Sequence, residues 1–164
     1  MSDDLFDRQA GNDSDKEAIM AGQVGIACDH AGLELKRALA AELGKRAVVL
    51  RDFGTTTSES CDYPDFAHAV GRAIESGEID RAILICGTGV GMSIAANRHP
   101  AVRAVVCSEP LSARMSRQHN DANVLCIGAR IVGMGTATDI VDAFLTASFE
   151  GGRHATRVAK INLT

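Results

Sequence analysis

The 164-residue sequence lacks the features that mark membrane-spanning, nucleic-acid-binding and zinc-stabilised proteins. No apolar run approaches the ~18 residues that a bilayer-spanning helix needs, so we expect a soluble protein. The net charge is −4, and it comes from residues 1–21, because basic and acidic side chains balance over the rest of the chain. No basic face for nucleic acid or an anionic membrane is therefore expected. The five cysteines include no C-x-x-C pair and no Cys/His cluster with zinc-like spacing, so we expect no structural metal.

The cysteine count also bears on where the protein works. An odd number of scattered cysteines, without a hydrophobic signal segment, fits a reducing compartment, and we expect the protein in the cytoplasm. The chain length suits one packed core. We expect residues 1–21 to form a disordered acidic tail and residues 22–164 to form a single domain.

Short β-rich runs alternate with segments of helical spacing along the domain. The expected strands are 24–28, 47–51, 82–86, 102–107 and 124–127. This alternation predicts an α/β fold in which helices cover both faces of a five-stranded parallel sheet.

The spacing of apolar residues predicts amphipathic helices between the strands. Leu35, Leu39 and Leu43 recur every fourth residue, which predicts an apolar stripe on a helix that ends at Gly44. The charged residues between them are expected to face water: Glu34, Lys36 and Arg37. Two further helices, at about 64–76 and 135–147, are expected to bury Phe66, Val70, Ala73 and Ile74 in the first and Ala137, Ile140, Val141 and Phe144 in the second.

The most informative segment is ICGTGVG at 85–91, where an apolar strand ends on Cys86 and turns into a glycine-rich loop. The alternate glycines let the backbone approach an anion closely, and a helix expected over 92–97 would direct its positive end there. A thiol at such a position can ionise below its reference pKa of about 8.5 and act as a base. The alternative is that Cys86 only packs, because Cys is among the most buried residue types.

Other reactive side chains follow strands or helices, and in open α/β sheets ligands bind outside the carboxyl ends of the strands. Asp29 and His30 follow the first strand, although Asp29 also suits a helix N-cap. His119, flanked by amide and carboxylate groups, suits a general acid or base, or a helix end that it stabilises through the dipole. Arg153 and Arg157 are four residues apart and suit a phosphate dianion, or are solvated surface arginines.

Seven short segments recur in chain order: CDHAG at 28–32, DYP at 62–64, ICGTGVG at 85–91, SIAAN at 93–97, RAVV at 103–106, SRQHN at 116–120 and EGGRH at 150–154. Together they resemble type B ribose-5-phosphate isomerases of the RpiB/LacAB sugar-phosphate isomerase family, over about residues 23–160. The resemblance implies a Rossmann-like three-layer α/β/α sandwich and a homodimer with active sites shared between subunits, or a tetramer. It also implies cofactor-free and metal-free interconversion of D-ribose 5-phosphate and D-ribulose 5-phosphate, in the non-oxidative branch of the pentose phosphate pathway.

The resemblance also implies roles for individual residues. Cys86 would be the base that moves a proton between C1 and C2, and His119 would assist opening of the furanose ring. The developing enediolate oxygens would be held by Thr88 and by the loop residues Gly87, Gly89, Val90 and Gly91. The implied sugar contacts are Asp29, His30, Tyr63 and Asn120, and the implied phosphate ligands are Arg130, Arg153 and Arg157.

Three alternatives stay open at this point. The glycines at 87, 89 and 91, with Glu109 about twenty residues downstream, permit a dinucleotide-binding module, although their spacing is G-x-G-x-G rather than G-x-G-x-x-G. A non-catalytic sugar-phosphate sensor is the second, because a fold does not fix a function. The third is an isomerase for a hexose phosphate such as allose or galactose 6-phosphate.

Overall fold

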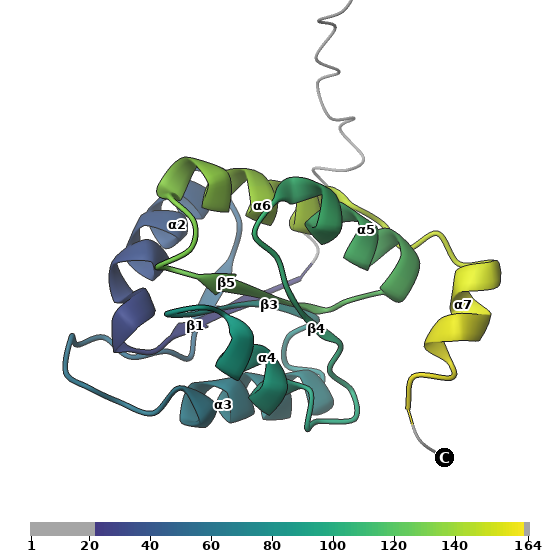
Figure 1. The fold of residues 1–164 in the computed structure, drawn as a ribbon, viewed down its shortest axis with the longest axis horizontal. Helices are drawn as coiled ribbons and strands as arrows, with labels where there is room; N and C mark the ends of the chain where they lie inside the picture. The colour runs from purple at the N-terminus through teal and green to yellow at the C-terminus, as the bar shows by residue number, and fades with distance from the viewer. Residues whose placement is uncertain (1–21, 163–164) are drawn as a thin grey trace, which may run out of the picture.

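The computed structural model describes residues 22–162, so the predicted acidic tail lies outside the described residues (Figure 1). Its strands are β1 (Val24–Cys28), β2 (Leu50–Asp52), β3 (Arg81–Cys86), β4 (Ala104–Val106) and β5 (Val124–Gly128). They form one all-parallel sheet in the order β2-β1-β3-β5-β4. The predicted five-stranded parallel sheet is therefore confirmed.

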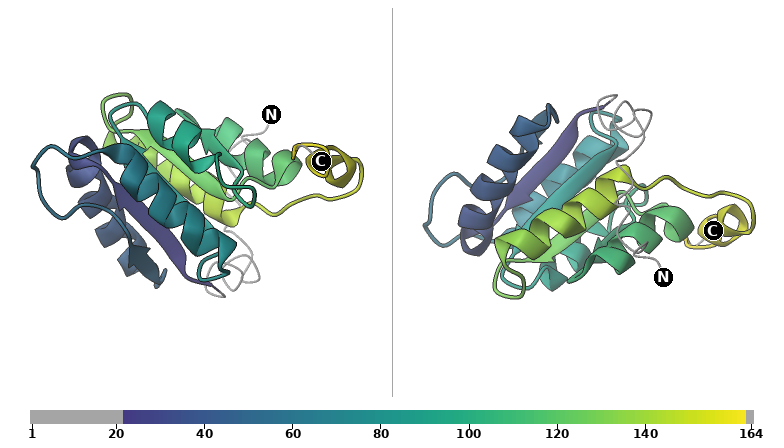
Figure 2. Two further views of the ribbon diagram at one scale, coloured as in Figure 1. Left: turned by 90° about the horizontal axis from the view of Figure 1, so that it is seen from below. Right: turned by 90° about the horizontal axis from the view of Figure 1, so that it is seen from above.

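Helices cover both faces of this sheet (Figures 1 and 2). One face carries α2 (Leu33–Lys45), α5 (Pro110–Asn120) and α6 (Met134–Thr146), and the other carries α3 (Tyr63–Glu75) and α4 (Val90–Ala96). A short 3-10 turn, η1 (His30–Gly32), precedes α2. The last helix, α7 (Arg153–Val158), projects from the end of the molecule where α5 ends. The architecture is the expected α/β/α sandwich.

Two hydrophobic clusters lie on the two faces of the sheet. The face of α6 predicted to be buried is fully so, with Phe144 at 0% exposure. On α3, Val70 and Ala73 are buried, while Phe66 and Ile74 pack at the margin of the second cluster. Among the described residues, no helix is long and apolar enough to cross a bilayer.

Three elements differ from their predicted form, and one of them is β4, which covers only Ala104–Val106 of the predicted strand 102–107. In α2 the charged residue Lys36 is buried, Leu35 is only partly so, and the helix continues through Gly44 to Lys45. Strand β2 begins at Leu50 rather than at residue 47, because Ala47 takes a left-handed conformation (φ 57°) after the helix. Val48 then packs into the core ahead of the strand.

The strand order places a topological switch point between the carboxyl ends of β1 and β3. After β1 the chain crosses to α2 on one face, and after β3 it crosses to α4 on the other, so the two loops diverge there. The Asp29 amide donates to the Ile85 carbonyl at 3.2 Å, which ties the two strand ends together. Ligands of open α/β sheets bind at such switch points.

Candidate active site

Cys86 is the last residue of β3, and its sulfur faces the glycine-rich loop as the sequence predicts. The amide N–H of Gly89 donates to the Cys86 Sγ at 3.1 Å. The residue is 5% exposed, whereas Cys28 and Cys126 are at 0%. An amide donor that points at sulfur stabilises a thiolate, so this contact suits a base.

Two glycines of this loop have distinct structural roles. Gly89 has a φ of +80°, in the left-handed region that side chains rarely adopt. At Gly91 an added Cβ would lie 2.6 Å from the Cζ atom of Tyr63, because the ring of Tyr63 lies over that backbone. The start of α3 therefore brings Tyr63 onto the loop that holds Cys86.

Arg130 comes to the same loop from the segment after β5. Its amide donates to the Gly87 carbonyl at 3.0 Å, and the Ala129 amide donates to the Cys86 carbonyl at 2.8 Å. A Cβ added at Gly87 would lie 3.3 Å from a terminal nitrogen of the Arg130 guanidinium. An exposed positive charge therefore lies beside the loop, where an anionic group of a ligand would meet it.

Asp29 and His30 complete the group at the carboxyl ends of the strands. The Asp29 Oδ1 atom accepts from the amides of Ala31 and Gly32 at 3.0 and 3.1 Å, so Asp29 does serve as the N-cap of η1. The Nδ1 atom of His30 accepts from the amide of Cys61 at 3.2 Å. Both residues directly follow the carboxyl end of β1, which pairs with β3.

Burial raises the pKa of three of the other four thiols, whereas Cys61 is only partly buried. Burial raises the pKa of Cys28 to about 11 and raises the pKa of Cys107 and Cys126 as well. These three groups stay protonated at neutral pH, so they act as packing residues.

A second group of predicted site residues lies around the end of α5 and α7. The rings of His119 and His154 are stacked in parallel, with centroids 4.2 Å apart, and the Glu150 carboxylate lies 3.8 and 3.6 Å from their Nε2 atoms. Burial, the neighbouring His119 and the Arg153 charge lower the pKa of His154. Arg153 and Arg157 are exposed on α7, four residues apart as predicted.

His119, Glu150 and His154 are also the described residues that could gather around a metal ion, since their ligand atoms lie within 4.8 Å of one another. The two imidazole planes differ by only 2°. The nitrogen lone pairs lie in these two stacked, parallel planes, so they cannot both point at one ion. One ring would have to turn before both could ligate a metal.

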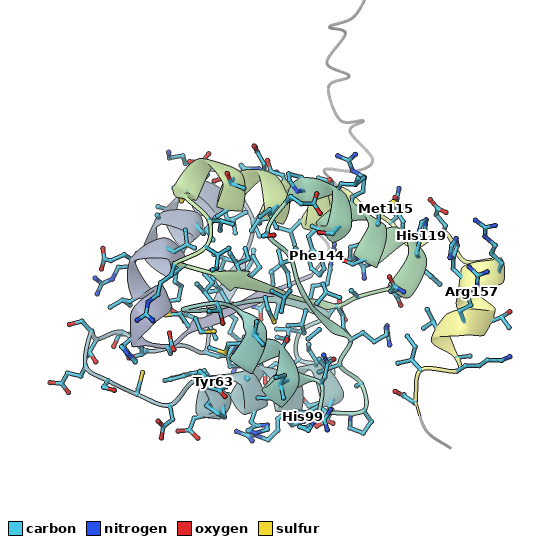
Figure 3. All side chains as sticks on the ribbon, viewed as in Figure 1. Tyr63, His99, Met115, His119, Phe144 and Arg157 are labelled. Carbon is cyan, nitrogen blue, oxygen red and sulfur yellow. The ribbon has the colours of Figure 1, made fainter. Side chains whose placement is uncertain are left out.

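The two groups lie at opposite ends of the strands. Cys86 is paired with Gly128 at the end of β5, whereas β5 begins at the level of Ala82, four residues or about 13 Å away. Since α5 ends just before β5 begins, His119 lies beyond that far end. Figure 3 shows Tyr63 at one side of the molecule and His119 and Arg157 at the other.

Within one chain the predicted site residues therefore form two separate groups, one around Cys86 and one around His119. The first group is Asp29, His30, Tyr63, Cys86, Gly87, Thr88, Gly89, Val90, Gly91 and Arg130. The second group is His119, Asn120, Arg153 and Arg157.

The sequence did not single out Lys36 or Cys61. Cys61 contacts His30 of the first group, and Lys36 binds Thr55 in the segment that leads to Cys61. Lys36 was expected to face water, yet its ammonium lies 2.6 Å from Asp52 and is buried. The amide of Cys61 is a backbone group, so no residue type could have indicated its contact with His30.

Comparison with known proteins places the chain among sugar-phosphate isomerases. The Ribose/Galactose Isomerase family model matches residues 24–161. The chain is 55% identical over 139 residues to ribose-5-phosphate isomerase B of Escherichia coli, covering 85% of this chain and 93% of that protein. Ribose-5-phosphate isomerase B of Clostridium thermocellum has a similar structure, with a TM-score of 0.83 and 57% identity over 85% of this chain and 94% of that one.

A third relative was solved with a sugar phosphate. It is ribose-5-phosphate isomerase B of Mycoplasma genitalium with bound ribulose 5-phosphate, which gives a TM-score of 0.82 and 42% identity over 87% of this chain and 95% of that chain. The matches extend over nearly the full length of these relatives and over the whole described sheet. The chain belongs to the Ribose/Galactose Isomerase family.

Proposed function

We propose that the chain is an aldose–ketose isomerase that interconverts D-ribose 5-phosphate and D-ribulose 5-phosphate, with Cys86 as the base. The Cys86 thiolate takes the proton from C2 of the open-chain aldose and returns it to C1, through a cis-enediolate, while the proton of the O2 hydroxyl passes to O1. Protons alone are moved, so the reaction needs no cofactor. The relatives named above support the substrate, and the contact between the Cys86 sulfur and the Gly89 amide carries the assignment of the base.

The glycine-rich loop has the chemistry to stabilise the enediolate. Negative charge develops on O1 and O2 as the proton leaves carbon, and a preorganised donor aimed at such an oxygen contributes ~3–4 kcal/mol. Thr88 is exposed at the loop, and its hydroxyl accepts from the Val90 amide at 3.3 Å, which fixes its direction. We assign the enediolate oxygens to this loop and the sugar hydroxyls to Asp29 and His30.

A complete site then needs a second copy of the chain. His119, with Asn120, lies at the opposite end of the strands from Cys86, so a single chain cannot bring the ring-opening group to the base. In a two-fold dimer each subunit can contribute Cys86 to one active site and His119 to the other. We propose that Arg153 and Arg157 reach the phosphate of the partner's site in this way, opposite Arg130.

The face for this partner lies at the open edge of the sheet. Strand β4 is an edge strand, and α4 and α5 precede and follow it along the chain. These three elements expose five large apolar side chains: Val90, Ile94, Val106, Leu111 and Met115. The face begins at Val90, in the same loop as Cys86, which is where a shared site must lie. Apolar side chains gathered in this way mark a protein interface.

The five free cysteines suit a reducing compartment, and we propose that the enzyme works in the cytoplasm.

The test of the base is Cys86→Ala, with Cys107→Ala as the matched control. Both changes remove one sulfur atom from a buried position at or after a strand end, at 5% and 3% exposure. We expect Cys86→Ala to lower kcat by about 10²–10⁴-fold, as for loss of a positioned base, while calorimetry still detects binding of ribose 5-phosphate. Cys107→Ala should keep wild-type turnover. Full activity of the Cys86 variant would remove that residue from the mechanism.

The substrate is tested by comparing kcat/KM for ribose 5-phosphate, allose 6-phosphate and galactose 6-phosphate, with and without a chelator. We expect the pentose to be preferred and the chelator to have no effect. Preference for a hexose would reassign the substrate, and binding without turnover of any of the three would make the chain a sugar-phosphate sensor.

A further inference from the structure

Lys36 is a buried cation beside the candidate active site. It lies on α2 and is 3% exposed, although charged residues are almost never buried unless they are paired. Its ammonium donates to the Asp52 Oδ2 atom at 2.6 Å and to the carbonyl of Thr55 at 2.7 Å. It therefore links α2 to the end of β2 and to the irregular segment that follows.

That segment, residues 53–62, leads from β2 to the start of α3 and passes next to the site. Its first residues continue alongside β1, since the Phe53 amide donates to the Ile26 carbonyl at 2.8 Å and the Thr55 amide to the Cys28 carbonyl at 3.1 Å. Lys36 holds the same Thr55 from the other side. Residues 56–60, which follow Thr55, are exposed. Lys36 therefore binds the last residue of the segment that is hydrogen-bonded to the end of β1.

At its far end the segment contacts His30. The Cys61 amide donates to the His30 Nδ1 atom at 3.2 Å, and the Cys61 sulfur lies 3.8 Å from the same nitrogen. A backbone N–H can only donate, so Nδ1 must be without a proton in this arrangement. The neutral ring therefore carries its proton on Nε2, and His30 presents an N–H donor on the side away from the segment.

We propose that Lys36 is a positioning residue for His30: by anchoring segment 53–62 it keeps the Cys61 amide on Nδ1, and so fixes the tautomer that offers Nε2–H to an oxygen of the substrate. The last step rests on the proposed function, which assigns His30 to the sugar phosphate. The tautomer itself does not depend on that assignment.

The neighbouring Arg37 cannot substitute for Lys36. It donates to the Thr56 carbonyl at 3.1 Å, but its side chain is 58% exposed and is also paired with Glu34. Exposed ion pairs of this kind contribute little to stability. The Lys36 ammonium is the stronger anchor, because its side chain is only 4% exposed and makes two hydrogen bonds to the segment and the end of β2, although the Asp52 side chain is 46% exposed.

The primary experiment is NMR of the ¹⁵N-labelled protein without substrate, which distinguishes a protonated from an unprotonated imidazole nitrogen. His30→Asn identifies the His30 signals among the five histidines. The wild-type chain should show an unprotonated Nδ1 and a protonated Nε2 at neutral pH. Lys36→Met should give averaged signals from both tautomers, whereas Lys45→Met, on the same helix with a 73% exposed side chain, should leave the wild-type pattern.

Two further variants separate the contributions of the segment. Cys61→Ser removes the thiol and keeps the amide, so the tautomer should stay as in wild type. Asp52→Asn withdraws the counter-charge of Lys36 and should shift the pattern in the same direction as Lys36→Met, and it serves as the test should Lys36→Met not fold. A proton on Nδ1 in the wild-type chain, or a His30 pattern that neither Lys36→Met nor Asp52→Asn alters, would overturn the proposal.

Kinetics add an independent readout. Because a hydrogen bond made in both the ground state and the transition state affects binding alone, Lys36→Met should raise KM by about tenfold, or ~1.4 kcal/mol, with kcat nearly unchanged. An unchanged KM in a variant whose tautomer is lost would show that Nε2–H does not meet the substrate. If wild-type protein turns over no sugar phosphate, the proposed function fails while the NMR result still decides the role of Lys36.

Discussion

Substituting Gly91 tests whether Tyr63 lies over the loop that holds Cys86. In Gly91→Ala the new Cβ would come 2.6 Å from Tyr63 Cζ and 2.7 Å from its Cε2 atom, and both distances are shorter than real Cβ atoms show. Because Tyr63 is 39% exposed, the ring can swing toward solvent instead of unfolding the loop. The variant should therefore fold, with Tyr63 displaced from the site.

The expected change in stability is the difference of two terms. An alanine near the start of α4 gains about 0.5 kcal/mol over glycine from backbone entropy. Moving the ring outward exposes on the order of 40 Å² of apolar surface and costs about 1 kcal/mol. Gly91→Ala should thus lower the free energy of unfolding by about 0.5 kcal/mol.

Gly135→Ala is the matched control, because Gly135 is the second residue of α6 as Gly91 is of α4, and an added Cβ there meets nothing within 4 Å. It should raise the free energy of unfolding by about 0.5 kcal/mol. The two variants should then differ by about 1 kcal/mol, or ~2–4 °C in Tm for a chain of this length. Urea and thermal unfolding measure both quantities.

Steady-state kinetics complete this test. The KM of Gly91→Ala for ribose 5-phosphate should rise, and that of Gly135→Ala should not. In a Tyr63→Ala background, Gly91→Ala and Gly135→Ala should change the free energy of unfolding by the same amount, since no ring is left to displace. Equal stability shifts in the two glycine variants, with KM unchanged, would refute the packing of Tyr63 on Gly91.

Two further predictions concern the shared site and the start of α5. If each site combines Cys86 of one subunit with His119 of another, then mixing inactive Cys86→Ala and His119→Asn chains, after dissociation and reassembly, should restore about a quarter of wild-type activity; no recovery would contradict shared sites. The pKa of Glu109 is lowered by hydrogen bonds from the Ser112 side chain and from the amides of Ser112 and Leu111, so its contribution is present above its usual value of 4.5 and is lost as pH falls through the lowered value. In urea unfolding, Glu109→Gln should be less stable than wild type at pH 7 and equal to it in acid; a difference that persists in acid would show that the charge is not responsible.

Periodicity and local motifs predicted the alternation of strands and helices, the buried face of α6 and the place of Cys86 at a strand end, because these features depend on residues close in sequence. The buried state of Lys36 could not be predicted in this way. Its partners Asp52 and Thr55 meet it only after β2 has paired with β1, so a pattern within α2 marks it as solvent-facing.

The arrangement of the candidate site shows the same limit. The sequence supplied His119 and the arginines of α7 as site residues, but nothing local to them tells at which end of the strands they lie. That follows from the parallel register, in which α5 must return to the amino end before β5 can begin. The contact of Cys61 with His30 is made by a backbone amide, which nearly every residue type has, so the sequence could not indicate it.

The placement of the thiol and the histidine at opposite ends of the strands has a consequence for newly synthesised protein. Under the proposed arrangement, a folded monomer has no activity until it associates with a second subunit. In dilute solution the rate would then grow with the square of the enzyme concentration, and it would become linear once association is complete. Expression level would thus act on flux more steeply than it does for an enzyme whose monomer is already competent.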